Sequence, residues 1–223
     1  MTRVIAFDVN ETLLDLRALD APFVELLGSA GLRPRWFAEM LQLSFVGGLT
    51  GRYVDFGAAQ RAALRMVAER LGRTITDEEV DGLVERMSSL PPHPEVSEAL
   101  ARLREGPLKI AALTNSTRVV AERQLATARL RDYFDEVLSA DEVGALKPAP
   151  APYLAAAERF GVAIDDLRLV AAHSWDVSGA LAAGARAAFV ARPGMVLSPL
   201  GPQPDIVATD IADAVDQILD RDP

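Results

Sequence analysis

Residues 4–15 read VIAFDVNETLLD, a short apolar run that stops at Asp8 and continues into a polar turn. The run contains β-branched and aromatic residues and no polar position, which is typical of a strand buried on both faces of a parallel sheet. We therefore expect a central strand that ends at an acidic residue. Similar strands are expected at 109–113, 167–171, 186–190 and 206–208.

Helical patterns separate these runs along the chain. They cover residues 94–105, 117–128, 149–160, 176–184 and 209–219. Strands that alternate with helices build right-handed βαβ units, so the pattern predicts an α/β fold with a Rossmann-like doubly wound parallel sheet. Ligands of such sheets bind where the strands reach their carboxyl ends.

Residues 15–91 depart from this alternation, because their pattern is helical throughout. Four helices are expected there, at 17–29, 34–48, 55–71 and 77–89. The Pro-rich stretch 90–94, LPPHP, then prevents a helix from continuing. We expect a helical cap domain over residues 15–91, inserted after the first strand, and an α/β core formed by residues 1–14 and 92–223. The cap would lie over the carboxyl edge of the sheet.

Composition excludes several classes of protein. The 223 residues are half hydrophobic and a quarter charged, which is ordinary for a globular chain and excludes disorder, collagen and coiled coil. The net charge of −9 makes nucleic acid and anionic membranes unfavourable partners. The absence of cysteine excludes disulfides, thiolate metal sites and a cysteine nucleophile. Asp8 comes too early for a signal peptide, and no apolar window of about 18 residues occurs, so we expect a soluble cytoplasmic protein.

Polar residues follow several of the expected strands. Asp8 ends the first strand, Thr114 and Asn115 end the second, Lys147 precedes the helix at 149, and Asp176 follows the strand at 167–171. Taken singly, such residues usually cap helices or face solvent. Because parallel strands share one carboxyl edge, an acid, a hydroxyl group, an ammonium group and a second acid would meet there. We interpret the combination as an active site.

This arrangement resembles the haloacid dehalogenase superfamily of aspartate-nucleophile hydrolases over essentially the whole chain, the cap included. The four motifs of that family carry over as Asp8 with Thr12, Thr114, Lys147 and Asp176. The resemblance implies that Asp8 is the nucleophile and that Thr12, Lys147 and Asp176 are the other catalytic residues.

Two substitutions bear on the metal. Phosphatases of the superfamily carry acids where this chain has Asn10 and Ala172. Mg²⁺ needs carboxylate ligands, so we expect a site with no metal and no cofactor. The pattern is similar to the type II L-2-haloacid dehalogenases, which implies hydrolytic removal of halide from small 2-haloalkanoic acids through an aspartyl-ester intermediate.

The resemblance also suggests which residues bind a small carboxylate substrate. Phe37 stands where those dehalogenases have an arginine that accepts the halide, Asn10 stands where they have an aromatic residue, and His173 stands where they have an amide. Arg35 or Arg52 would then have to replace the arginine from nearby, although both are more typical of solvated positions. The full set of expected substrate-binding residues is Asn10, Thr114, Asn115, Tyr153, His173, Trp175, Phe37 and Phe56.

Two other functions remain open from the sequence. One is a Mg²⁺-dependent small-molecule phosphatase of the same superfamily, and the other is a catalytically altered binding protein that keeps the fold. Sensitivity to EDTA would separate the first from a dehalogenase, and loss of turnover in Asp8→Asn would separate both enzymes from the second. The sequence leaves the oligomeric state open, although the apolar cap helices could support a homodimer.

Overall fold

A parallel sheet of six strands, in the order β3-β2-β1-β4-β5-β6, forms the centre of the protein in a computed structural model that describes residues 2–222. Every neighbouring pair of strands is parallel. The predicted α/β class and doubly wound sheet are therefore confirmed. The strands are β1 (Val4–Phe7), β2 (Lys109–Thr114), β3 (Glu136–Ser139), β4 (Leu167–Ala171), β5 (Arg186–Val190) and β6 (Ile206–Ala208).

Strand β3 is the one element of the sheet that the sequence did not predict. It reads EVLS, and its residues alternate between partly and fully buried positions. It lies at the edge of the sheet, where its neighbouring strand is β2, and Ala111 of β2 is opposite Glu136 of β3. An edge strand needs no continuous apolar run, so its four residues carry too weak a pattern to stand out.

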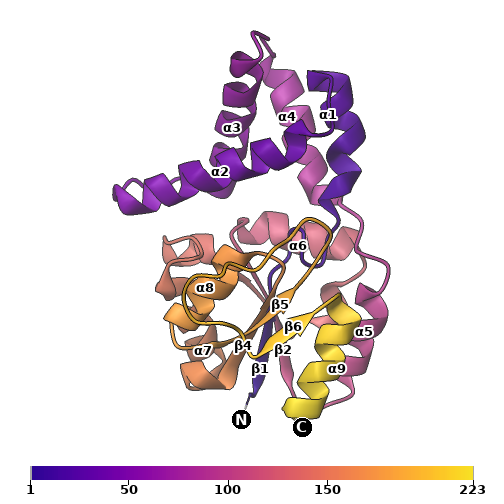
Figure 1. Ribbon diagram of the computed structural model, residues 1–223, viewed down its shortest axis with the longest axis vertical. Helices are drawn as coiled ribbons and strands as arrows, with labels where there is room; N and C mark the ends of the chain where they lie inside the picture. The colour runs from indigo at the N-terminus through magenta and orange to yellow at the C-terminus, as the bar shows by residue number, and fades with distance from the viewer. Residues whose placement is uncertain (1, 223) are drawn as a thin grey trace.

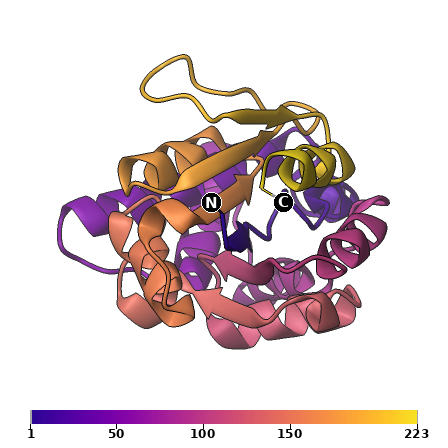
Figure 2. The ribbon, with the colours of Figure 1, turned by 90° about the horizontal axis from the view of Figure 1, so that it is seen from below.

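Helices lie on both faces of the sheet (Figure 2), and the buried apolar side chains form two hydrophobic clusters. Ile5 and Phe7 of β1 pack into one cluster, whereas Val4 and Ala6 pack into the other, as the alternation of side chains along a strand requires. The first cluster includes residues of α5 (Val96–Arg104), α6 (Arg118–Thr127) and α9 (Ile211–Arg221). The second includes residues of α7 (Pro150–Phe160) and α8 (Ser174–Ala182).

The remaining long helices form a separate group at the carboxyl edge of the sheet (Figure 1). They are α1 (Asp20–Leu27), α2 (Leu32–Leu49), α3 (Phe56–Arg70) and α4 (Asp77–Glu85). The two chain segments that lead to and from this group meet in an antiparallel bridge between Leu14 and Pro92. We propose that residues 15–91 form a cap domain and that the rest of the chain forms the core.

Local sequence explains where the cap helices begin and end. The Asp55 side chain accepts a hydrogen bond from the Ala58 N–H at the start of α3, and Thr76 and Glu79 form a capping box at the start of α4. Gly28 ends α1 with a φ of 85°, a left-handed angle that favours glycine. Short 3₁₀ helices complete the structure at Leu16–Leu19, Arg86–Ser89, Arg131–Tyr133, Ala140–Val143 and Ile164–Asp166.

The cap is also tied to the core at the far end of α2. The hydroxyl group of Tyr53, just beyond that helix, donates a hydrogen bond to the carboxylate of Asp141 in the core.

Among the helices of residues 2–222, none combines the length and the apolar character that a membrane crossing demands.

Candidate active site

Lys147 joins two acidic residues at the carboxyl edge of the sheet. Its ammonium group donates hydrogen bonds to Asp8 Oδ1 at 2.9 Å, to Asp176 Oδ2 at 2.6 Å and to the carbonyl oxygen of Leu113 at 2.7 Å. All three charged side chains are buried. The structure therefore brings together the acid, the ammonium group and the second acid that the sequence placed at this edge.

Thr12 holds the other oxygen of Asp8. Its hydroxyl group donates to Asp8 Oδ2 at 2.7 Å and accepts a hydrogen bond from the backbone N–H of Ala172 at 2.9 Å. The hydroxyl group thus connects the loop after β1 with the end of β4. This fixes the Asp8 carboxylate relative to two adjacent strands.

Tyr153, which was expected to bind the substrate, is buried and contacts Asp176 instead. Its hydroxyl group donates to Asp176 Oδ1 at 2.5 Å, and the whole side chain is buried. Gly179 permits this contact, because a Cβ atom at that position would come within 2.7 Å of the Tyr153 hydroxyl oxygen. Tyr153 therefore positions the second acid from inside the core.

Asn115 secures the backbone of Lys147 through two hydrogen bonds. Its Oδ1 accepts from the Lys147 N–H at 2.8 Å, and its Nδ2 donates to the Lys147 carbonyl oxygen at 3.1 Å. The neighbouring Thr114 accepts a hydrogen bond from the Ser116 N–H at 3.2 Å. Both residues are buried beside the cluster, and Asn115 acts on it by orienting the loop that carries Lys147.

Asn10 has protein partners for both of its polar groups. Its Nδ2 donates to the Ser116 hydroxyl oxygen at 3.3 Å, and its Oδ1 accepts from Gln124 Nε2 at 3.0 Å. Gln124 also donates to the carbonyl oxygen of Met87 at 2.7 Å. These bonds link the loop after β1 to α6 and to the end of the cap segment.

His173 contacts the Asp8 oxygen that Thr12 also holds. Its Nδ1 lies 3.2 Å from Asp8 Oδ2, and its Nε2 lies 2.8 Å from Glu11 Oε2. Glu11 in turn accepts a hydrogen bond at 3.3 Å from Arg33, which belongs to the cap helix α2. A chain of alternating charges therefore runs from Asp8 to the cap.

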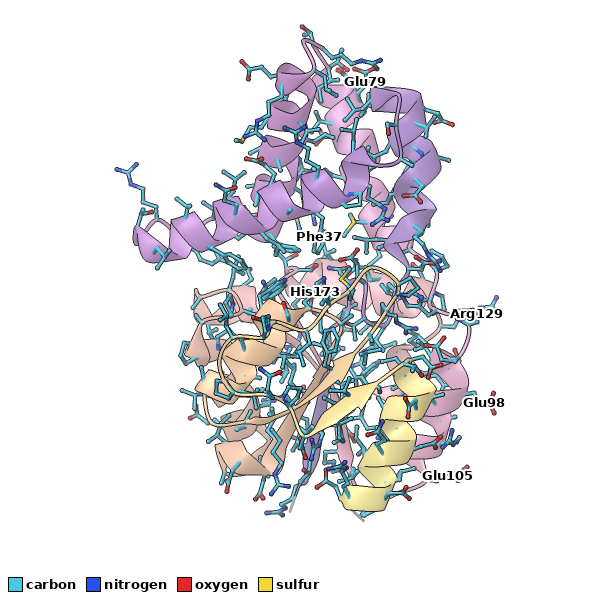
Figure 3. The ribbon with its side chains drawn as sticks, viewed as in Figure 1. Phe37, Glu79, Glu98, Glu105, Arg129 and His173 are labelled. Atoms are coloured by element: carbon cyan, nitrogen blue, oxygen red, sulfur yellow. The ribbon has the colours of Figure 1, made fainter. Side chains whose placement is uncertain are left out.

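Two aromatic side chains stack on the His173 ring. Phe37 of α2 stacks on it from the cap, with ring centres 5.4 Å apart and an interplanar angle of 13° (Figure 3). Trp175 also stacks on the His173 ring, at 5.1 Å and 25°, and the ring of Phe45 meets Trp175 edge-on at 5.7 Å. Aromatic rings therefore pack around His173, beside Asp8, where the cap meets the core.

Of the remaining residues considered from the sequence, two are buried and two face solvent. Phe56 is buried where α3 begins. Arg35 and Arg52 are both exposed. His93 is buried, and its Nε2 lies 3.1 Å from the backbone carbonyl oxygen of Glu11.

Two residues of the site, Glu11 and Arg33, were not found from the sequence. Glu11 has a φ of 62°, in the left-handed region where residues other than glycine are uncommon. The sequence shows an acidic residue between Asp8 and Thr12. Its contact with His173 could not be predicted, because His173 lies 162 residues away in the chain. Arg33 could not be found from local pattern, because its contact depends on how the cap sits on the core.

The electrostatics of the site favour charge on Asp8. Burial raises the pKa of the Asp8 carboxyl, but attraction to Lys147 and the hydrogen bond from His173 outweigh it and hold this pKa well below its ordinary value. For Asp176, burial together with repulsion from Asp8 outweighs the attraction of Lys147, so its pKa lies above the ordinary value. Burial lowers the pKa of Lys147, but Asp176 and Asp8 raise it further, which keeps the ammonium charged.

His173 is also held in its charged form. Burial lowers its pKa, but hydrogen bonds to Asp8 and Glu11 outweigh burial and raise the pKa from 6.5 to about 9. At neutral pH both ring nitrogens therefore carry hydrogens and donate to the two carboxylates.

The donor set of the site does not fit a resident Mg²⁺ ion. Both oxygens of Asp8 and both oxygens of Asp176 already accept hydrogen bonds from protein donors, and the positions of Asn10 and Ala172 supply no carboxylate. Within residues 2–222, no group of three or more histidine or acidic side chains is arranged to hold a metal ion.

Comparison with known proteins identifies the family. The family model described as haloacid dehalogenase-like hydrolase matches residues 2–184, so the chain belongs to this family and the resemblance inferred from its motifs is confirmed. The chain is 29% identical over 211 residues to (S)-2-haloacid dehalogenase 2 of Pseudomonas sp. (strain CBS-3), covering 94% of this chain and 92% of that protein. It is 28% identical over 217 residues to haloacetate dehalogenase H-2 of Moraxella sp. (strain B), covering 96% of each.

Solved structures agree with this assignment. The L-2-haloacid dehalogenase of Xanthobacter autotrophicus superposes with a TM-score of 0.92 at 26% identity, over 100% of both chains. The same enzyme with chloropropionic acid covalently bound also superposes with a TM-score of 0.92, at 25% identity over 100% of both chains.

Proposed function

We propose that the protein is a metal-independent hydrolase that removes halide from small 2-haloalkanoic acids, with Asp8 as the nucleophile. The observation that carries this proposal is the buried Asp8 carboxylate, held ionised by Lys147 at the edge of the sheet beside the aromatic rings that pack around His173. A carboxylate kept charged and shielded from water is a competent nucleophile. The similarity to (S)-2-haloacid dehalogenases supports the choice of substrate.

The reaction has two steps. In the first, an oxygen of Asp8 attacks the carbon that bears the halogen, the carbon–halogen bond breaks, and an ester forms on Asp8 with inversion at that carbon. In the second, water attacks the carbonyl carbon of this ester and releases the 2-hydroxy acid. The oxygen that first enters the product therefore comes from Asp8.

Each neighbouring residue has a role in this scheme. Lys147 stabilises the Asp8 carboxylate before attack, and Thr12 orients it. Asp176, positioned by Tyr153, orients the hydrolytic water together with Lys147. On the cap side, Phe37, Trp175 and His173 border the substrate, and Thr114 and Phe56 stay predicted substrate contacts. Of the other residues expected to bind it, Asn115 and Tyr153 act by positioning Lys147 and Asp176, and Asn10 braces the loop after β1.

The test is halide release from both enantiomers of 2-chloropropionate and from haloacetates, with EDTA present. We expect the wild type to release halide, to prefer one enantiomer and to lose at least about a thousandfold in rate in Asp8→Asn. A single turnover in ¹⁸O water should place unlabelled oxygen in the first product. Activity that needs added Mg²⁺ and phosphate esters would contradict the proposal.

We also propose that the protein forms a homodimer through the far end of α2. That end projects beyond the core (Figure 1), and Val46 and Leu49 on it are 47% and 88% exposed. Leu49 lines an apolar groove of about 510 Å³, together with Phe45, Val54, Leu146 and Pro148. Light scattering should give twice the mass of the chain, and Leu49→Glu should shift it to the monomer.

A further inference from the structure

The His173 ring is fixed more firmly than packing alone would require. Its two nitrogens contact Asp8 and Glu11, and Phe37 and Trp175 stack on it. The side chain is only 5% exposed. One nitrogen is therefore held toward the nucleophile, and the ring cannot turn toward solvent without breaking these contacts.

The chain accepts backbone strain to place Glu11 there. A φ of 62° at a residue with a Cβ atom costs about 1 kcal/mol relative to glycine. The side chain of Glu11 reaches His173 and Arg33, and its backbone carbonyl oxygen is met by His93. Strain of this kind persists where the surroundings hold it, often at functional sites.

We propose that Glu11 and His173 form a dyad that serves the second step of the reaction, in which His173 Nδ1 accepts the proton of the water that hydrolyses the Asp8 ester. Glu11 is the positioning residue, because its contact with Nε2 directs Nδ1 toward Asp8. This inference rests on the proposed function, since it requires an ester on Asp8.

The charges around His173 explain why the base would act only after the ester has formed. Asp8 and Glu11 contact the ring directly, Lys147 contacts the far oxygen of Asp8, and Arg33 stands behind Glu11. The aromatic groups that stack on the ring are uncharged. Esterification removes the negative charge of Asp8 and one of the two attractions that raise the pKa of His173, so the imidazolium loses its proton to solvent.

The proton balance of the hydrolytic step closes within the site. Water attacks the carbonyl carbon of the ester while Nδ1 takes one of its protons. The bond then breaks between that carbon and the former Asp8 oxygen, which stays on the substrate. The departing alkoxide takes the proton back from Nδ1. The Asp8 carboxylic acid that remains gives its proton to the imidazole, which restores the ion pair with Asp8.

Single-turnover kinetics with enzyme in excess over 2-chloropropionate separate the two steps. Chloride release reports the formation of the ester, 2-hydroxypropionate reports its hydrolysis, and the intact mass of the protein reports the ester itself. His173→Phe keeps an aromatic ring beside Phe37 and Trp175 but has no nitrogen. Because the ring also borders the substrate and contacts Asp8, we expect chloride release to slow by up to about tenfold, whereas hydrolysis should slow by about a hundredfold and the ester should accumulate.

Glu11→Gln tests the positioning role through a pH profile. We expect hydrolysis to slow by about tenfold and its midpoint to move to lower pH, because the ring loses a negative partner. Glu11→Gly removes the same carboxylate at a backbone angle that glycine tolerates, so slow hydrolysis in that variant does not come from failure to fold. Glu98→Gln is the matched control, since Glu98 is an exposed residue of α5 far from His173 (Figure 3).

The outcomes distinguish the dyad from the function on which it rests. If chloride release and hydrolysis slow equally in His173→Phe and no ester appears, the dyad is overturned while Asp8 remains the nucleophile. An unshifted pH profile in Glu11→Gln would also overturn it. If the wild type releases no halide from any substrate, the proposed function falls and the dyad falls with it.

Discussion

The two oxygens of Asp8 face two different kinds of surroundings. Oδ1 accepts a hydrogen bond from Lys147, whose partners Asp176 and Leu113 belong to the core. Oδ2 contacts Thr12 and His173, and that side continues through Glu11 to the cap. One half of the site is therefore complete within the core, whereas the other half depends on how the cap is seated. The core side therefore supplies Lys147, which keeps Asp8 charged, and Asp176, which orients the hydrolytic water, whereas the cap side supplies His173 as the proton acceptor.

The largest effect is expected from Lys147→Met, which removes the hydrogen bonds to Asp8 and Asp176 on the core side. Asp8 and Asp176 would lose their shared cation inside the protein, so halide release should fall by at least about a thousandfold and the free energy of unfolding by about 3 to 5 kcal/mol. Halide assays and urea unfolding measure the two effects. Lys109→Met is the control, because Lys109 is exposed at the start of β2. Similar losses in both variants would show that Lys147 has no special role.

On the cap side, His173 should make the free energy of unfolding depend on pH. The pKa of His173 is about 9 in the folded protein against 6.5 as its ordinary value. The stabilisation it contributes is therefore complete below pH 6.5 and is lost as pH rises through 9, by about 3 kcal/mol in all. Urea unfolding from about pH 6 to 10 should show this fall in the wild type and a flatter curve in His173→Phe. Parallel curves for the two proteins would contradict the assignment.

Tyr153→Phe tests the core side more gently. Asp176 keeps Lys147 but loses the hydroxyl donor at 2.5 Å, so its pKa should rise further and the hydrolytic water should be less well oriented. We expect about a tenfold loss of turnover and about 1 to 2 kcal/mol in the free energy of unfolding. Tyr133→Phe, on a 3₁₀ helix of the core, provides the control. An unchanged rate would mean that Lys147 alone orients Asp176.

The sequence predicted the core side of the site and part of the cap side, since Thr12, His173 and Phe37 were also expected there. Asp8, Lys147 and Asp176 were predicted to meet because each follows or precedes a regular element, and parallel strands bring such positions to one edge. Glu11 and Arg33 were missed because their contacts depend on a left-handed turn and on the seating of the cap. Strand β3 was missed for a related reason, since its order comes from pairing with β2 rather than from its own four residues.

The smallest effect is expected from Arg33→Met, which loosens the cap side without touching Asp8. Arg33 also pairs with Asp20 at 2.6 Å, and its side chain is 12% exposed, so the change should cost about 1 kcal/mol or less in the free energy of unfolding. Glu11 would keep its contact with His173 but lose the cation behind it.

Ester hydrolysis in Arg33→Met should therefore slow by about two- to fivefold while chloride release is unchanged. High salt should change this difference little, because the side chains of Arg33 and Glu11 are only 12% and 11% exposed and such a pair is weakly screened. Arg35→Met is a matched control two residues along the same helix, where the side chain faces solvent. Equal slowing of chloride release and hydrolysis would mean that Arg33 acts by seating the whole cap, and that the two sides of Asp8 are not independent.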